Sequence, residues 1–313
     1  MSLLNKPNLL SLLILGGVVL IACGYGVVTY TQSPDREHFP VDPAYDFAFN
    51  FDQPDKVVDL PKDLKEISGL APWRAADEVL AVQDEKGKLF VLNTNTGKVK
   101  DKLSFGKDRD YEGVARIGND IYVLEGDGDI FHISYTDGKE VFKAGKLETP
   151  FSLQNDTEGI CLDPVTGHLL IVPKARQLNP ADKDMHQHGV YGFNLTDSML
   201  AQQPLFYVDE LEVGKVVYGK TTRYHFKPSG IAVDPITKDI YVLASVGKIL
   251  IVINRESEIK HIELLKKKVF RQPEGLTFNE IGDLFISSEG KSGKGIVATF
   301  KRNTRQEKGT TNE

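Results

Sequence analysis

The chain of 313 residues has only two cysteines, so it cannot carry a disulfide framework. It also lacks a basic excess, because 38 lysines and arginines stand against 44 acidic residues, a formal charge of −6. This balance argues against a nucleic-acid-binding surface. No segment after residue 35 shows sustained 3.6-residue periodicity, which argues against long helices. The 28 glycines, 11 tyrosines and 16 phenylalanines instead favour many short strands joined by tight turns, and we expect an all-β body.

One long uncharged run stands near the N-terminus. Residues 9–28 carry no charge and are long enough, at about 20 residues, for a helix to cross a membrane. We expect residues 1–30 to be either an uncleaved signal anchor or a lipoprotein signal, because Leu20-Ile21-Ala22-Cys23 resembles a lipoprotein box with the lipid on Cys23. Both alternatives tether the body to a bacterial membrane on its extracytoplasmic (periplasmic) side. Residues 31–55, with four prolines, are predicted to be a tether, and residues 304–313 a disordered tail.

A short pattern recurs five times: two residues, then serine or glutamate, then glycine and aliphatic residues. The copies are Glu66-Ile67-Ser68-Gly69-Leu70, Asp110-Tyr111-Glu112-Gly113-Val114, Asp156-Thr157-Glu158-Gly159-Ile160, Lys227-Pro228-Ser229-Gly230-Ile231 and Gln272-Pro273-Glu274-Gly275-Leu276. The glycines are 44, 46, 71 and 45 residues apart, and the long interval contains a polar insertion at about residues 175–190. Four-strand units of this length are typical of β-propellers. The sequence therefore predicts a five-bladed β-propeller of four-stranded antiparallel blades over residues 56–303.

The last unit ends before it can form a fourth strand. A strand candidate precedes the first repeat, at Lys56-Val57-Val58-Asp59-Leu60. We expect it to supply the outer strand of the last blade and so to close the ring, which protects sheet edges that would otherwise be exposed.

The repeat also predicts an acidic channel mouth. A glycine on the innermost strand suits the crowding of blades around the axis, and the residue before it then has the same height in every blade. These positions are Ser68, Glu112, Glu158, Ser229 and Glu274. Strand alternation adds Glu66, Asp110, Asp156, Lys227 and Gln272, and the ends of the second strands add Asp84, Glu125, Lys174, Ser245 and Glu289. Gathered carboxylates repel one another, so either their pKa values rise or a cation neutralises them.

Hard oxygen ligands without a histidine or cysteine ring favour calcium. The alternative is that each glutamate accepts backbone N–H bonds at a tight turn or faces channel water. Spacing alone leaves both alternatives open.

The five units, with Asp110-Tyr111-Glu112-Gly113 and Asp156-Thr157-Glu158-Gly159 prominent, resemble the SdiA-regulated (YjiK-like) family of membrane-anchored bacterial proteins. The resemblance covers roughly residues 56–303. It implies a five-bladed propeller, distantly related to NHL-repeat proteins, with one bound calcium ion near the axis. Glu112, Glu158 and Glu274 are then the best candidate ligands.

For three other features of the sequence, a structural role explains the residues better than a metal-binding or catalytic role. Glu125-Gly126-Asp127-Gly128-Asp129 lacks the later glutamate and the helices of an EF-hand, and a hairpin turn explains it better. His186 and His188, with Asp182 and Asp184 nearby, are conceivable zinc ligands, but no further ligand cluster accompanies them. Cys161 lies in an apolar strand-like stretch, and we expect it to be a small buried hydrophobic residue.

The sequence is compatible with two functions. The first is a non-enzymatic module, without catalytic residues, that binds a small ligand or an extracytoplasmic protein and no nucleic acid. The second is a calcium-dependent hydrolase of the lactonase, esterase or phosphoester type, in which the ion polarises an oxygen and activates water. No positioned histidine base supports the second function, because His132 and His261 fall in strands. Fold class alone does not decide between them.

Overall fold

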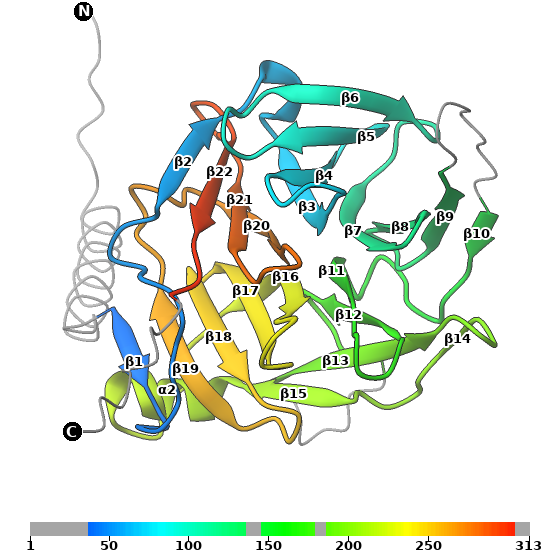
Figure 1. The fold of residues 1–313 in the computed structure, drawn as a ribbon. Helices are drawn as coiled ribbons and strands as arrows, with labels where there is room; N and C mark the ends of the chain where they lie inside the picture. The colour runs from blue at the N-terminus through cyan, green and yellow to red at the C-terminus, as the bar shows by residue number, and fades with distance from the viewer. Residues whose placement is uncertain (1–36, 136–144, 179–185, 304–313) are drawn as a thin grey trace, which may run out of the picture. The chain divides into compact units, whose positions relative to one another are not determined.

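The computed structural model describes residues 37–135, 145–178 and 186–303, and these form five antiparallel β-sheets. The prediction of a five-bladed β-propeller is therefore confirmed (Figure 1). The expected N-terminal helix, Cys23 and the tail from residue 304 lie outside the described residues. In the part of the chain that the structure describes, no helix has the length and apolar character that a membrane crossing needs.

Three blades take their strands from the innermost to the outermost in chain order. The first consists of β3 (Ile67–Pro72), β4 (Glu78–Gln83), β5 (Lys86–Asn93) and β6 (Val99–Ser104). The second consists of β7 (Tyr111–Ile117), β8 (Asp120–Glu125), β9 (Ile130–Ser134) and β10 (Gly145–Leu147). The fourth consists of β16 (Lys227–Val233), β17 (Ile240–Val246), β18 (Ile249–Ile253) and β19 (Ile259–Leu264), with β1 (His38–Pro40) as an added outer strand.

The third blade divides its outer strand in two. It consists of β11 (Thr157–Leu162), β12 (Leu169–Pro173), β13 (Gln187–Asn194), β14 (Met199–Leu200) and β15 (Phe206–Asp209). Because β14 pairs with one end of β13 and β15 with the other, the two short strands together occupy the fourth position.

The fifth blade joins the two ends of the propeller chain. It consists of β20 (Pro273–Phe278), β21 (Leu284–Ser288), β22 (Ile296–Phe300) and β2 (Lys56–Asp59), which a short 3-10 turn, η1 (Lys62–Leu64), follows. Strand β2 pairs antiparallel with β22, placing Val58 opposite Val297. The predicted closing strand is thus confirmed, and its hydrogen bonds cover the edge that β22 would otherwise expose.

The innermost strands contact one another in the cyclic order β3, β7, β11, β16, β20 and back to β3 (Figure 1). The repeated glycines explain how they approach so closely. A Cβ on Gly69 would lie 2.6 Å from the Cα of Gly113, and one on Gly230 would lie 2.5 Å from the carbonyl oxygen of Glu274. A Cβ on Gly275 would meet the carbonyl oxygen of Ser68, which completes the cycle. Only glycine leaves room for neighbouring backbones at this radius.

Residues 38–55, for which the sequence predicts a tether, are part of the propeller unit. Strand β1 pairs with β19, and the side chains of Phe39, Phe49 and Phe51 are buried. The ring of Phe51 stacks on Phe300 with 4.2 Å between centroids. The three prolines in this stretch favour a free linker, but its aromatic residues bury enough apolar area to hold it on the surface of the blades.

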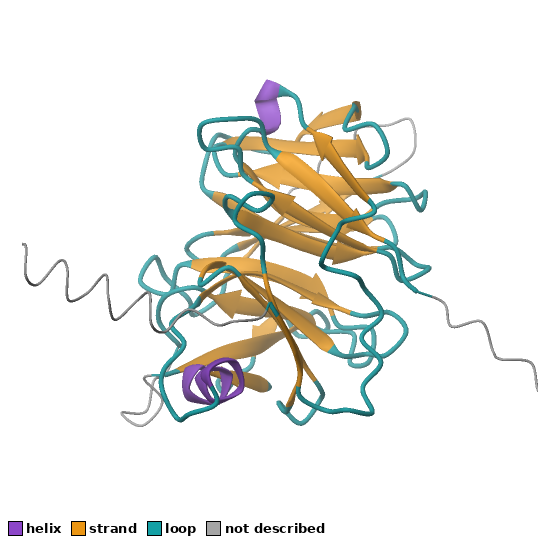
Figure 2. Ribbon diagram, turned by 90° about the vertical axis from the view of Figure 1, so that its left-hand side faces the viewer, coloured by secondary structure: helices purple, strands orange, loops and turns teal. Residues whose placement is uncertain are grey.

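One helix departs from the all-β prediction. Helix α2 (Glu210–Tyr218) lies between β15 and β16 and, like η1, at the periphery of the strands (Figure 2, purple). Asp209 caps its N-terminus by accepting N–H bonds from Leu211 and Glu212, and Gly219 ends it at φ 68°. Nine residues are too few to display sustained periodicity, but the Asp cap and the Gly stop were readable signals. The helix also accounts for part of the long spacing between Gly159 and Gly230, so the polar insertion is not its whole cause.

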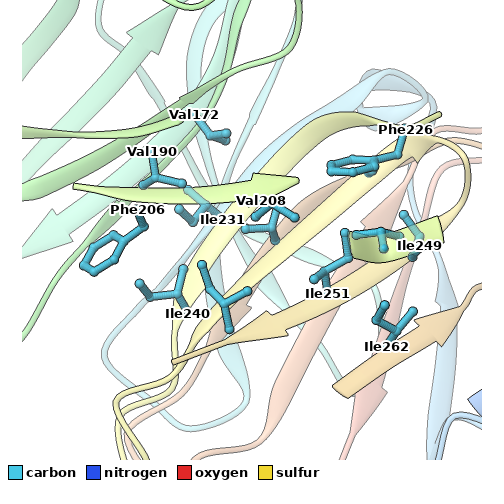
Figure 3. Packing of buried hydrophobic residues seen from close by; sticks show 14 of the residues in the cluster. Val172, Val190, Phe206, Val208, Phe226, Ile231, Ile240, Ile249, Ile251 and Ile262 are labelled. Carbon is cyan, nitrogen blue, oxygen red and sulfur yellow. The ribbon is translucent and has the colours of Figure 1, made fainter. Parts of the chain in front are cut away.

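The core consists of apolar clusters between neighbouring blades. The cluster between the third and fourth blades includes Val172, Val190, Phe206, Val208, Phe226, Ile231, Ile240, Ile249, Ile251 and Ile262 (Figure 3). The facing sides of neighbouring blades thus pack against each other. Burial of these side chains is the main force that holds the ring closed.

Candidate functional site

Each innermost strand carries a β-bulge next to its glycine. The pairing of this strand with the second strand skips the same place in all five blades. The skipped residues include Ser68, Glu112, Glu158, Ser229 and Glu274. A bulge leaves a residue unpaired and re-aims its side chain. The five residues therefore occupy one equivalent position, where the innermost strands begin.

Three of these positions hold glutamates that interact with one another, and we call them the axial trio: Glu112, Glu158 and Glu274. They come from three different blades, yet the charges of Glu158 and Glu274 act on Glu112. Glu158 and Glu274 are only 3% and 4% exposed. Closure of the ring therefore brings together side chains that are far apart along the sequence.

The environment opposes ionisation of the whole trio. Burial, together with the charges of Glu158 and Asp110, raises the pKa of Glu112 to about 10. Burial raises the pKa of Glu158 to about 7, against the attraction of Lys174. Burial and the charge of Glu158 raise the pKa of Glu274 to about 8. Desolvation and like charge both disfavour the carboxylate form, so a cation bound beside the trio would stabilise its ionised state.

One cation already lies among these glutamates. Lys174, just after β12, forms an ion pair with Glu158, and its charge also acts on Glu112 and Glu274. Burial by itself would lower the pKa of Lys174, but the carboxylates, Glu158 first, raise it above its usual value. The sequence predicts Lys174 at this mouth, but only the structure identifies it as the partner of Glu158.

A second group of acids surrounds the trio. Burial and the charges of Glu66 and Glu85 raise the pKa of Asp84 to about 6. Burial and the charge of Asp84 raise the pKa of Glu289. Asp84 Oδ1 and Glu274 Oε2 are buried and have no hydrogen-bond partner among the described residues. Two carboxylate oxygens at this mouth are thus desolvated without compensation, which is costly unless a further group binds them.

Asp110 and Asp156 precede the glutamates of their own blades by two residues and lie beside the trio. The charge of Asp110 acts on Glu112, and both aspartates act on Glu158. Asp156 adopts a left-handed backbone conformation at φ 54°, and its carbonyl oxygen accepts a hydrogen bond from the N–H of Lys174 at 2.7 Å. Both aspartates are therefore at the mouth where the sequence predicts them.

Glu125 lies one residue away from the position that the sequence predicts. The backbone N–H groups of Asp84, Gly126, Lys174 and Glu289 each donate to the residue two before the bulge of their own blade. The equivalent of Asp84 in the second blade is therefore Gly126. Because successive side chains of a strand alternate between faces, Glu125 points to the opposite face.

Glu125 belongs instead to the hairpin between β8 and β9. Its Oε1 accepts a hydrogen bond from Arg109 at 2.9 Å. Carboxylate oxygens of Glu125, Asp127 and Asp129 lie within 4.8 Å of one another. The N–H of Gly128 donates to the carbonyl oxygen of Glu125 at 2.8 Å, which agrees with the predicted hairpin turn. The metal ligand predicted at Glu125 is thus separated from the axial trio.

The donor set at the channel mouth suits a hard cation. Calcium takes 6–8 oxygen ligands at about 2.3–2.6 Å, and the trio with Asp110 and Asp156 offers carboxylate oxygens without a histidine or cysteine. Within the described ranges, no group of three ligand atoms within 4.8 Å of one another includes a member of the trio. The residues thus fit calcium in donor chemistry and charge, but their side chains would have to move closer together to share one ion. An ion bound there would compete with Lys174 for Glu158.

The remaining candidates lie elsewhere. His188 Nε2 is 3.3 Å from the carboxylate of Glu210, and Asp182 and Asp184 lie outside the described residues. Cys161, on β11, is partly buried, and burial raises the pKa of its thiol. An inert thiol agrees with its interpretation as a small hydrophobe.

Solved structures confirm the fold. The glutaminyl cyclase of Myxococcus xanthus is 11% identical with a TM-score of 0.54, and the match covers 80% of this chain and 96% of that one. The PQQ-bound aldose sugar dehydrogenase of Streptomyces coelicolor is 11% identical with a TM-score of 0.51, over 80% of this chain and 97% of that one. At such identity the likeness concerns the fold alone.

No curated protein matches the chain in sequence. The family model described as SdiA-regulated matches residues 49–291, which is well over half of the chain and includes all five repeated glycines. The chain therefore belongs to the SdiA-regulated family.

Proposed function

We propose that this propeller is a calcium-binding module that recognises a small ligand or a protein, tethered to the membrane on its extracytoplasmic side. The observation that carries the calcium proposal is the axial trio. Glu112, Glu158 and Glu274 come from three blades, are held together by closure of the ring, and each has a raised pKa. Lys174 carries one positive charge, against the three negative charges of the ionised trio.

Glu112, Glu158 and Glu274 would hold the ion, with Asp110 and Asp156 beside them. When bound, calcium would supply two positive charges to a partly dry site and link three blades through their innermost strands. Its role would be to stabilise the ring and to fix the shape of the acidic mouth.

The distribution of histidines favours binding over hydrolysis. A calcium-dependent hydrolase needs a general base beside the ion, most often a histidine. In the described residues, His132 is bonded to Asp120 on the second blade at 2.8 Å, and His261 is bonded to Glu263 on the fourth blade at 2.5 Å. Neither histidine is among the groups that act most strongly on the axial trio. The hydrolase remains the alternative, and turnover of a lactone or phosphoester panel that is lost in Glu158→Gln would establish it.

The calcium proposal is tested by thermal unfolding of the full chain in chelator and in excess calcium. A ligand that binds only the native state stabilises it by about 2.7 kcal/mol at a concentration of 100 times Kd. We expect calcium to raise the Tm of the wild type, and Glu274→Gln to reduce this shift. Glu280→Gln, in the turn that follows the other end of the same strand, is the control and should keep the shift. Equal melting curves with and without calcium, and no calcium by elemental analysis, would reject the ion.

The tether is tested separately, on the intact chain in its bacterial host. We expect the protein in the membrane fraction, with the propeller open to protease from the periplasmic side. A Cys23→Ala variant that leaves the membrane supports the lipoprotein, whereas one that stays supports the uncleaved anchor. Recovery of the wild type in a soluble fraction would contradict both.

A further inference from the structure

The end of the channel opposite the axial trio contains an apolar pocket. Its volume is about 170 Å³, and all five innermost strands line it with residues that follow their glycines. The lining includes, with one residue named for each blade, Leu70, Val114, Leu162, Val233 and Phe278. The axial trio precedes the same glycines, so the pocket and the trio lie at opposite ends of these strands. An apolar cavity of about 150 Å³ holds a benzene ring. The pocket therefore has room for a small apolar body.

A guanidinium lies at the wall of this pocket. Arg116, on β7, lines it and donates from Nη1 to the carbonyl oxygen of Trp73 at 3.1 Å. Its Nε is buried and has no hydrogen-bond partner among the described residues. A buried donor without an acceptor carries an uncompensated desolvation cost, which an incoming acceptor would remove.

The charge near the pocket is positive. The guanidinium groups of Arg74 and Arg116 lie 5.0 Å and 4.9 Å from the centroid of the Trp73 ring. Burial, followed by the charge of Arg74, lowers the pKa of Arg116. The acidic residue that lines the pocket is Glu280, which is exposed. Two cations beside one solvated carboxylate favour an anionic ligand group.

We infer that this pocket binds a small carboxylic acid with a compact apolar body, such as an arene carboxylate. The body lies among the five innermost strands, and the carboxylate accepts hydrogen bonds from Arg116. A guanidinium matches the geometry of a carboxylate, and such charge-assisted bonds strengthen where water is excluded. The inference does not depend on calcium, because no residue of the axial trio lines the pocket.

The test uses the full chain and two probes, benzoate and its neutral analogue benzyl alcohol, measured by calorimetry and by amide chemical shifts. We expect saturable benzoate binding, at least about 10-fold tighter than benzyl alcohol, with shifts confined to the five innermost strands β3, β7, β11, β16 and β20. Chelator should leave it unchanged, which separates this result from the calcium experiment. Equal affinities for the two probes, or no saturation, would overturn the inference.

Variants then assign the contact. Arg116→Gln should weaken benzoate binding about 10- to 100-fold, the usual range for a lost hydrogen bond to a charged group, and leave benzyl alcohol unchanged. The same substitution at the exposed Arg176 is the matched control. Glu280→Gln removes a like charge and should tighten benzoate about 2- to 5-fold, which tests the pocket even if Arg116→Gln fails to fold. Weaker or unchanged benzoate binding in Glu280→Gln would contradict the inference.

Discussion

At the scale of single residues, Lys174 contributes the positive charge that offsets the carboxylates of the acidic mouth. It is the cation that the structure pairs with Glu158, and the carboxylates raise its pKa. Two arrangements can satisfy Glu158: the lysine that is part of the chain, or a metal ion from solution. They compete for the same carboxylate, which gives the metal proposal its sharpest test.

We predict that Lys174→Met destabilises the protein in chelator, by about 3 kcal/mol or more, because removing one partner leaves a buried charge unpaired. Calcium should restore much of the lost Tm and should bind the variant more tightly than the wild type. Lys146→Met, which breaks an ion pair with Asp129 away from the trio, is the control. A destabilised Lys174→Met that calcium fails to rescue would show that lysine alone is the resident cation.

A second residue-scale prediction concerns Glu210, which is 1% exposed. Burial by itself would raise its pKa, but hydrogen bonds from His188 and Arg223 outweigh burial and lower the pKa of Glu210 to about 2. Its contribution to stability is therefore present above about pH 4.5, its ordinary value, and is lost as the pH falls towards 2.

The Tm of Glu210→Gln should be lower than that of the wild type at pH 6 and should approach it at pH 2.5. Thermal unfolding over this range measures the difference. A gap that stays constant with pH would mean that Glu210 acts through packing and not through its charge.

At the scale of elements, the bulges and the helix depart from the simple repeat. Alternation along a regular strand predicts which residues share a face, but a bulge adds one residue and changes the alternation locally. In the second blade Gly126 takes the position where the sequence suggested Glu125. Helix α2 departs from the prediction for a different reason: its nine residues are too few for a sustained period.

Asp209 gives the helix a testable end. We predict that Asp209→Ala lowers the free energy of unfolding by about 1 kcal/mol, because two N–H groups lose their acceptor. Asp209→Asn keeps an acceptor oxygen and should cost much less. Chemical denaturation of the two variants measures this, and equal losses would mean that the cap does not stabilise α2.

At the scale of the whole molecule, ring closure is the physical event on which the sites depend. Gly230 is held against the carbonyl oxygen of Glu274 in the next blade. We predict that Gly230→Ala costs several kcal/mol or prevents folding, because backbone atoms cannot move aside as a flexible side chain can. At Gly145, a Cβ would meet nothing within 4 Å, so Gly145→Ala should be close to neutral. Similar denaturation midpoints for the two variants would contradict this account of the repeat.

The five-fold repeat, the closing strand and the acidic positions before the glycines could all be read from the sequence, because each is a local pattern with a regular spacing. The docking of residues 38–55 could not, because prolines suggested a linker while the burial of Phe49 and Phe51 depends on surfaces from distant blades. The apolar pocket beside Arg116 could not be predicted for the same reason. Its five short aliphatic stretches form a cavity only when they surround one axis.

The sequence alone determined the architecture and the family, since β-branched runs, turn residues and the periodic glycine act over a few residues each. Only the tertiary structure decided which charges meet. Three such details are whether Glu158 faces Lys174, whether Glu125 lies at the axis, and whether Nε of Arg116 has an acceptor. They depend on single-residue register and on contacts across blades. Electrostatic energies change steeply with distance and burial, so they are fixed by the packing of the ring rather than by the order of residues along it.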